Sequence, residues 1–421
     1  MRVFGLSESV RRYVLASAMR ELGGWFFFTL LIFGTVAQTK SAVSAAVVAM
    51  AGSLPLVLMA IRSPHMIKRQ NRKIGLVTGN AFHALSSGIL AALAYYGVLE
   101  YWIIPVVNFA NGLVSALIEP ASKAYMRDIS QGDEVVRTPV ENALWRGTAQ
   151  IIAHLLLLVL LLADSFHQDI GAQVLYFCAY AVGAASDLIA VMLLLGTKPV
   201  HSNASMDDTS IPTPRPSGFR IRAFLAELRD AWDVVRSNRI LNTLIILNFG
   251  QMVFGTTYHV FPGYLANVLD RGIWDFVLVR FIGVTATTLC VFVACRRGSY
   301  EKPWLKSGQA LAALFAVEGL VQIVYPLSAD VLVLYFTYPI AFCAQGVAEV
   351  AIILGVQEQE GTENHGHKFA ALDAITALSS AVVILTGLLP EVVGNRWTIP
   401  LIGLTGIAFY TAVFLTAEKK A

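Results

Sequence analysis

The chain has 421 residues, of which 56% are hydrophobic and only 14% charged, and its formal net charge is +3. Soluble globular domains are roughly 25% charged, so this composition excludes an ordinary soluble protein. A net charge this small gives no sign of nucleic-acid binding.

Twelve apolar stretches follow one another along the chain, each close to the roughly 17–25 residues that a helix needs to cross a membrane. Their approximate bounds are 13–36, 41–62, 74–97, 101–122, 142–163, 170–195, 240–267, 273–295, 304–326, 331–356, 369–390 and 397–416. The first is too long for a cleavable signal sequence and is expected to remain as a membrane helix. The sequence therefore predicts an all-α membrane protein with twelve transmembrane helices.

Positive charge lies almost entirely in alternate gaps between these stretches. Of the 31 Lys and Arg residues, only Lys40, Arg271 and Arg396 fall on one side, and Arg20 and Arg280 lie deep inside stretches. Basic residues within a few positions of a stretch end are counted with the adjoining gap. The other side thus holds 26, including the N-terminal gap. Because cytoplasmic loops carry the excess of Lys and Arg, both termini are expected in the cytoplasm.

The longest polar segment divides the chain into two equal sets of six stretches. Residues 197–218 are rich in Pro, Ser, Thr and Asp, and such a segment has too little apolar surface to fold alone. Residues 219–238 then show apolar side chains at helical spacing, which predicts an amphipathic helix on the membrane surface or packed on the bundle. The expected organisation is a six-helix bundle over 1–196, a cytoplasmic linker over 197–239 and a second, pseudo-symmetric six-helix bundle over 240–421.

Three segments resemble the major facilitator superfamily, and most of all its bacterial drug- and siderophore-exporter branch. These are SAMRELGGWFF in the first stretch, IRSPHMIKRQNRKIGL between the second and third, and EPASKAYMRDI at the end of the fourth. The resemblance implies that Arg69, Arg72 and Lys73 belong to the gating loop. The chain departs from the family pattern at Lys68, where the family has an acid that latches the outward-open state. The fifth stretch also lacks the proline of proton-coupled exporters.

Ionisable residues inside membrane spans are costly and mark functional sites by default. The residues of this kind are Arg20, Glu21, Arg280, Glu318 and Glu349. A titratable carboxyl group in the membrane is the minimum requirement for proton coupling, so a proton is the candidate coupling ion, and no other cofactor is expected. Snorkelling of Arg20 to the interface is the structural alternative.

Neutral polar residues form stripes at helical spacing on the fourth and seventh stretches. The resemblance implies that the first, fourth, seventh and tenth helices line a central cavity. The residues then expected to bind substrate are Asn108, Asn111, Asn248, Gln251, His259 and Gln345. Hydrogen bonding between helices is the alternative for each of them.

Two sequence patterns that contain histidine are expected to be structural features and not functional sites. His154 lies among leucines and is expected to be a packed histidine. His365 and His367, two positions apart beside Gly366, would diverge on a helix, which favours a solvated loop over a metal site. No phosphate-binding loop, nucleophile elbow or zinc-protease pattern is present in the sequence, so no enzymatic activity is expected.

These features together predict a monomeric, multi-pass secondary active transporter of a bacterial inner or plasma membrane. We expect it to export a small amphipathic organic molecule by alternating access, as a proton antiporter if the buried acids titrate. A transporter-shaped sensor or partner-binding protein without flux is one alternative. An importer or metal-ion exporter on the same fold is another.

Overall fold

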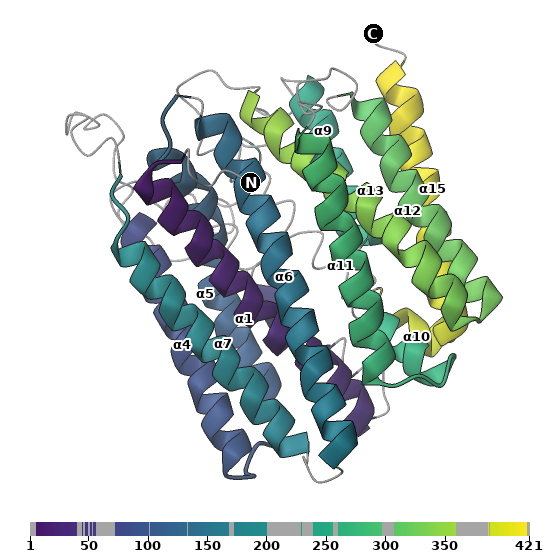
Figure 1. Cartoon of the computed structure of the whole chain (residues 1–421). Helices are drawn as coiled ribbons and strands as arrows, with labels where there is room; N and C mark the ends of the chain where they lie inside the picture. Colours follow the sequence, from purple (N-terminus) through teal and green to yellow (C-terminus); the bar gives the residue numbers. More distant parts are fainter. Residues whose placement is uncertain are drawn as a thin grey trace.

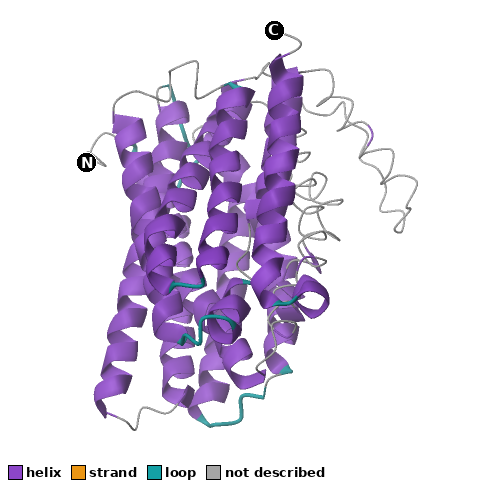
Figure 2. Cartoon of the chain, turned by 90° about the vertical axis from the view of Figure 1, so that its right-hand side faces the viewer, coloured by secondary structure: helices purple, strands orange, loops and turns teal. Residues whose placement is uncertain are grey.

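The computed structural model describes residues 6–39, 44, 47–48, 51–52, 54–55, 72–100, 102–132, 134–167, 172–199, 229, 239–255, 260–296, 307–358, 386 and 388–418. The described part contains helices and no strand. The long helices run along one common direction, and both chain ends lie toward the same end of the molecule (Figures 1 and 2).

The first half of the chain forms five described helices. They are α1 (Glu8–Thr39), α4 (Arg72–Tyr95), α5 (Ile103–Asp128), α6 (Glu134–His167) and α7 (Ala172–Leu195). The second half forms α9 (Arg239–Gly250), a π-helix (Gln251–Gly255), α10 (Phe261–Asn267), α11 (Ile273–Arg296), α12 (Gly308–Ser328), α13 (Val331–Glu358) and α15 (Asn395–Glu418).

Eight described helices are long and apolar enough to cross a membrane, by length and composition. They correspond to eight of the twelve apolar stretches. The stretches 41–62 and 369–390, and the amphipathic segment 219–238, fall almost entirely outside the described residues. The multi-pass, all-helical architecture is therefore observed, and the count of twelve crossings stays a prediction.

The helices of each half pack in corresponding pairs. In the first half α4 packs on α7 and α5, and in the second half α12 packs on α15 and α13. Counted by apolar stretch, the third helix of each half thus packs against the sixth and the fourth helix of the same half. The halves meet chiefly along α6 and α11, which lie side by side in Figure 1. At this contact a Cβ atom added to Gly147 would lie 2.4 Å from Oγ1 of Thr288, so glycine permits the close approach.

Buried apolar clusters are distributed unequally between the two ends of the molecule. One cluster joins α1 and α6 to α10, α11, α12 and α13, and contains Phe26, Leu157, Phe261 and Tyr338. Toward the end that carries the chain termini, one cluster belongs to the first half and another to the second. A small cluster around Val291 bridges α6, α11 and α13. The larger shared core therefore lies toward the end away from the termini.

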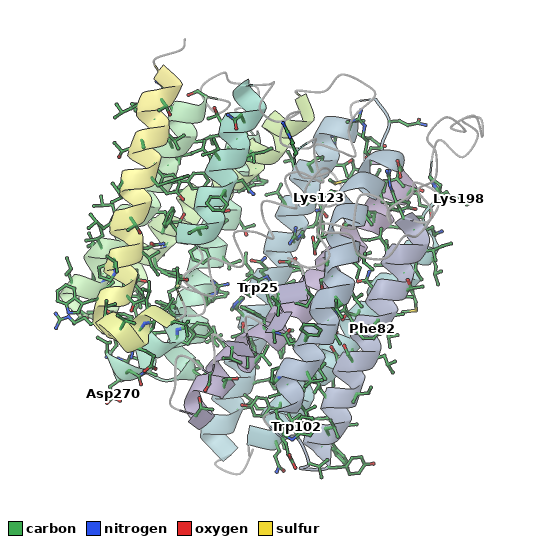
Figure 3. All side chains as sticks on the ribbon, turned by 180° about the vertical axis from the view of Figure 1, so that it is seen from behind. Trp25, Phe82, Trp102, Lys123, Lys198 and Asp270 are labelled. Carbon is green, nitrogen blue, oxygen red and sulfur yellow. The ribbon has the colours of Figure 1, made fainter. Side chains whose placement is uncertain are left out.

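Labelled residues mark the two ends of the molecule. Lys198 lies toward one end, and Trp102 and Asp270 lie toward the other, with Trp25 between them (Figure 3). Trp102 has an exposed side chain, as is common for tryptophan at the level of the lipid headgroups.

Candidate functional site

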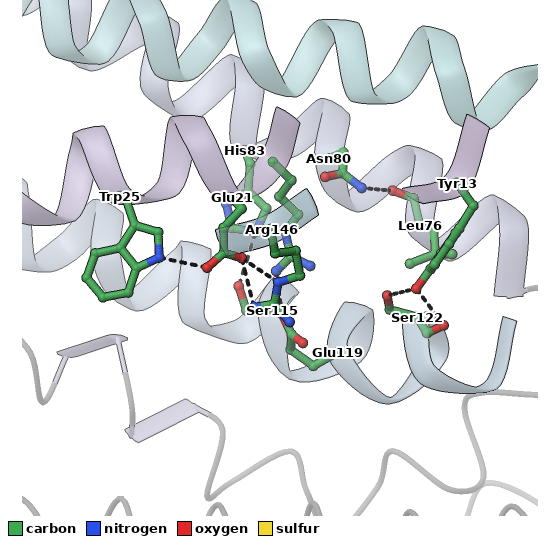
Figure 4. A network of polar contacts seen from close by, with 11 residues as sticks. Tyr13, Glu21, Trp25, Leu76, Asn80, His83, Ser115, Glu119, Ser122 and Arg146 are labelled. Atoms are coloured by element: carbon green, nitrogen blue, oxygen red, sulfur yellow. Dashed lines mark hydrogen bonds and ion pairs between the residues drawn. The ribbon is translucent and has the colours of Figure 1, made fainter. Parts of the chain in front are cut away.

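Glu21 on α1 is the centre of a polar network within the membrane-spanning part of the first half (Figure 4). Trp25 lies four residues further along the same helix, so the two side chains share a face. The indole Nε1 of Trp25 donates a hydrogen bond of 2.7 Å to Oε1 of Glu21. This contact fixes the carboxylate against an aromatic ring.

Helix α6 supplies the counter-charge of Glu21. Arg146 contacts Oε2 of Glu21 at 2.7 Å through Nη2 and at 2.8 Å through Nε, and Gln150 donates to Oε1. The side chain of Glu21 is 14% exposed and that of Arg146 is 41% exposed. The ion pair is thus reachable by solvent from the arginine side.

Arg146 was missed as a site residue. It lies four residues inside the fifth stretch, 142–163, and was grouped with the positive charges that precede this stretch. The structure places it inside α6, within the candidate span Arg137–Ala163. One signal was available in the sequence: Arg146, Gln150 and His154 are four residues apart in succession and form a polar stripe on one face.

A second ion pair lies beside the first. Arg20 contacts Oε1 of Glu119, on α5, at 2.7 Å, and Arg146 and Lys123 act electrostatically on the same carboxylate. Arg20, the sequence neighbour of Glu21, therefore forms its ion pair with a residue of α5. On α4, Nε2 of His83 lies 3.2 Å from the hydroxyl of Ser115 on α5.

Arg280 brings the second half of the chain to this network. Its side chain on α11 is 2% exposed. The guanidinium carbon lies 4.4 Å from the ring centroid of Trp25 and 5.2 Å from that of Phe342 on α13. Such placements over aromatic faces are attractive cation–π interactions. A chain of contacts thus runs from α11 through Trp25 and Glu21 to α6.

The polar residues of α5 make hydrogen bonds within the first half. Asn108 donates to the backbone carbonyl of Val48 at 2.7 Å. Asn111 is buried and accepts a bond of 2.7 Å from Ser86 on α4. These contacts supply the interhelical role that sequence reasoning left open, and a substrate role for both residues stays a prediction.

The remaining predicted residues of the second half are spread over α9, the π-helix and α13. Asn248 and Gln251 are buried, and Gln345 is half-buried. His259 and the side chain of Glu349 lie outside the described residues, as do the whole His365–Lys368 segment and Arg69.

Glu318 lies apart from the Glu21 network, within the second half. It is 4% exposed, and its Oε2 atom has no hydrogen-bond partner among the described residues. One turn along α12, Gln322 donates 2.9 Å to the carbonyl of Phe254 in the π-helix. Glu318 is therefore a second buried carboxyl group, away from the junction between the halves.

The structure describes two residues of the predicted gating loop, Arg72 and Lys73, and both contact other residues of the first half. Arg72 forms an ion pair with Asp128, at the end of α5, at 2.9 Å. Nζ of Lys73 donates to the carbonyls of Leu195 and Thr197 at 2.9 and 2.7 Å. Cations are favourable at a helix C-terminus, where carbonyl groups are unpaired, so Lys73 stabilises the end of α7.

Metal-ligating side chains do not converge in the part of the chain that the structure describes: no group of three or more His, Cys, Asp or Glu residues is placed to hold an ion.

Comparisons with known proteins agree with the all-helical fold. A family model described as transmembrane secretion effector matches residues 6–237. No curated protein matches the chain.

Three solved structures are similar over nearly the whole chain. The human organic anion transporter MFSD10 (TETRAN) has 11% identity and a TM-score of 0.69, covering 98% of this chain and 99% of that one. The xylose transporter XylE from E. coli has 14% identity and a TM-score of 0.64, covering 96% and 98%. An auto-inhibited POT family peptide transporter has 11% identity and a TM-score of 0.66, covering 99% and 97%. At these identities the likeness shows the fold alone.

The family model spans more than half of the sequence and covers the segments whose resemblance pointed to the same group. The chain is therefore a multi-pass membrane protein that belongs to the major facilitator superfamily, in the family described as transmembrane secretion effector.

Proposed function

We propose that this chain is a secondary active transporter that exports a small amphipathic organic molecule by alternating access, with Glu21 as the coupling carboxyl group. The family description, transmembrane secretion effector, supports the outward direction. The positive charge of alternate gaps supports cytoplasmic termini in a bacterial inner or plasma membrane.

The observation that carries this proposal is the chain of contacts through Glu21. Arg280 of the second half lies over Trp25, which donates to Glu21, and Glu21 pairs with Arg146 of α6. Because α6 and α11 form the main described contact between the halves, a change at Glu21 acts on both sides of that contact. A ligand or proton that binds there with different affinity in two states shifts the balance between them.

The unequal apolar clusters support the alternating movement. The shared core around Phe26, Phe261 and Tyr338 holds the halves together toward the end away from the termini. The clusters around Val10 and Phe315, toward the end that carries the termini, belong to separate halves. Only the small cluster around Val291 joins α6 to α11 and α13 there among the described residues. With cytoplasmic termini, this arrangement corresponds to a state closed toward the outside. Transport then requires the shared core to part and the separate clusters to meet.

The surroundings of Glu21 suit a substrate with both apolar and charged parts. Trp25 packs against Phe28 and His154, and Phe342 lies beneath Arg280. Aromatic faces provide apolar area, while the Glu21–Arg146 pair offers one group of each charge. The predicted amide residues Asn108, Asn111, Asn248, Gln251 and Gln345, together with His259, complete the proposed substrate-binding set.

The experiment that tests transport is counterflow in proteoliposomes. Amphipathic organic molecules are first screened for thermal stabilisation of the purified chain, and the hits are loaded into vesicles with labelled compound outside. Saturable counterflow by wild type is the expected result. Stabilisation by ligand without counterflow would favour a sensor or partner-binding protein, and accumulation restricted to metal ions would favour metal-ion transport.

A further inference from the structure

His154 lies beside the Glu21 network, and a backbone contact determines which of its ring nitrogens can accept a hydrogen bond. It lies on α6 one turn after Gln150, with its side chain fully buried. Its Nδ1 is 2.7 Å from the backbone carbonyl oxygen of Gln150. A carbonyl oxygen only accepts, so Nδ1 carries the hydrogen, and Nε2 of the neutral ring is a lone-pair acceptor.

The contact of Nδ1 with the Gln150 carbonyl sets this tautomer of the ring. The ring is completely buried. It packs against Trp25, whose own ring lies under the guanidinium of Arg280.

Nε2 of His154 is a buried atom with no hydrogen-bond partner in the described part of the chain. Buried polar atoms in proteins nearly always have one, so an unpaired acceptor at a charged network needs an explanation. The ring centroid of His154 lies 5.9 Å from that of Trp25, the residue that touches both Glu21 and Arg280. The ring that carries the unpaired atom thus lies beside the contact chain that runs from Arg280 through Trp25 and Glu21 to Arg146.

We propose that His154 is a specificity-determining residue, whose Nε2 accepts a hydrogen bond from a ring hydroxyl or N–H group of the transported molecule. This inference rests on the proposed function and narrows its substrate to hydroxylated or amino-substituted aromatic acids. The flat faces of Trp25 and Phe342 suit an aromatic ring. The guanidinium groups of Arg280 and Arg146 suit an acidic group on the same molecule.

The test compares ligands that carry the hydroxyl donor with ligands in which a methyl group replaces the hydroxyl hydrogen, and the variants below separate the donor from the size of the methyl group. Dissociation constants are measured by calorimetry on the full chain in nanodiscs for 3- and 4-hydroxybenzoate and for the matching methoxybenzoates. A site that hydrogen-bonds a hydroxyl rejects the analogue without it. Wild type should bind at least one hydroxybenzoate about tenfold more tightly than its methoxy partner, the difference expected for one hydrogen bond.

Two substitutions at the same position separate the acceptor from packing. His154→Phe keeps an aromatic ring and removes the acceptor, so the preference for the hydroxyl should disappear. His154→Gln keeps an acceptor at similar reach and should retain part of it. Without ligand, the unfolding temperature of each variant is measured separately. His154→Phe removes an unpaired buried atom but also the hydrogen bond to the Gln150 carbonyl, so the preference is compared only in variants that stay folded.

The proposal is overturned if neither hydroxybenzoate binds wild type, if the methoxy partners bind equally well, or if His154→Phe keeps the preference. Failure of the proposed function gives a different result. Selective binding of hydroxybenzoate without counterflow would leave the role of His154 in place and remove transport. Counterflow of a substrate that His154→Phe transports as wild type does would leave transport in place and remove the role of His154.

Discussion

Glu21 and Arg146 join α1 to α6 through an ion pair of 2.7 Å. The pair is 125 residues apart in sequence, and Trp25 and Gln150 hold the same carboxylate from both helices. Since the arginine side chain is 41% exposed, solvent screens the pair, and its contribution to stability is expected to be about 1 kcal/mol or less. Its importance lies in its position at the contact between the halves.

The cation–π contact between Trp25 and Arg280 should couple the two halves energetically. A double-mutant cycle with Trp25→Leu and Arg280→Met should give a coupling energy of about 1–2 kcal/mol, because the contact is shielded from water. The free energy of unfolding is measured by SDS titration in mixed micelles. The control is the exposed pair Arg396–Trp397, at 5.9 Å, where about 0.5 kcal/mol is expected. Equal coupling energies in both cycles would contradict a special role for Trp25–Arg280.

Gly147 should be intolerant of a larger side chain because of Thr288. Gly147→Ala places Cβ 2.4 Å from Thr288 Oγ1, and the overpacking should cost about 1–3 kcal/mol and reduce transport. Thr288→Ala removes the obstructing atoms, so it should restore much of the loss in the double variant. Gly88→Ala is the matched control, since nothing lies within 4 Å of a Cβ there. An unaltered melting temperature for Gly147→Ala would show that α6 and α11 do not approach closely.

Alanine substitutions at Asn111 and Gln345 should differ in their effect on the stability of the protein. Asn111→Ala removes the hydrogen bond that joins α5 to Ser86 on α4. The Ser86 hydroxyl keeps the carbonyl of His83 as an acceptor, so the loss should be about 1 kcal/mol of stability as well as transport. Gln345→Ala should lower transport while the free energy of unfolding changes by about 0.5 kcal/mol or less. Thermal unfolding and counterflow are measured on the same preparations. Normal transport by Gln345→Ala would remove it from the substrate-binding set.

The orientation of the chain is tested by labelling single cysteines in a variant without the four native ones. Asn203→Cys in the linker should react only from the cytoplasm. Asp270→Cys, which lies at the end opposite Lys198 in Figure 3, should react only from outside. The reason is the excess of Lys and Arg in alternate gaps. Reaction of Asn203→Cys with an impermeant reagent in intact cells would overturn both the orientation and the inference of an outward-closed state.

The sequence was sufficient to predict the helical membrane fold and the family, because an apolar stretch reports directly on the lipid environment. It was a weaker guide to where helices end. The fifth stretch was expected at 142–163, and α6 runs from Glu134 to His167. The helix extends beyond both ends of the apolar stretch and includes charged residues such as Arg137 and Glu141. Apolar character therefore marks the buried part of a helix and not its full length.

The candidate site was predictable only in part. Glu21 stood out as a carboxyl group within an apolar stretch, but its partner Arg146 did not, because it lies near the boundary where charges are ordinary. Nor could the sequence show that Arg20 pairs with Glu119 or that Trp25 faces Arg280. These contacts depend on how helices far apart in sequence are rotated against each other, which single-helix periodicity does not determine.

The central claim, that Glu21 couples a proton to export, is tested most directly by pH-driven flux in proteoliposomes containing Glu21→Gln. Glutamine keeps the shape and one acceptor oxygen but cannot exchange a proton. Glu318→Gln serves as the matched control, a second buried acid away from the junction. We predict that Glu21→Gln abolishes uphill transport driven by a pH gradient while counterflow of the same substrate persists, and that Glu318→Gln retains both. Undiminished pH-driven accumulation by Glu21→Gln would contradict the account.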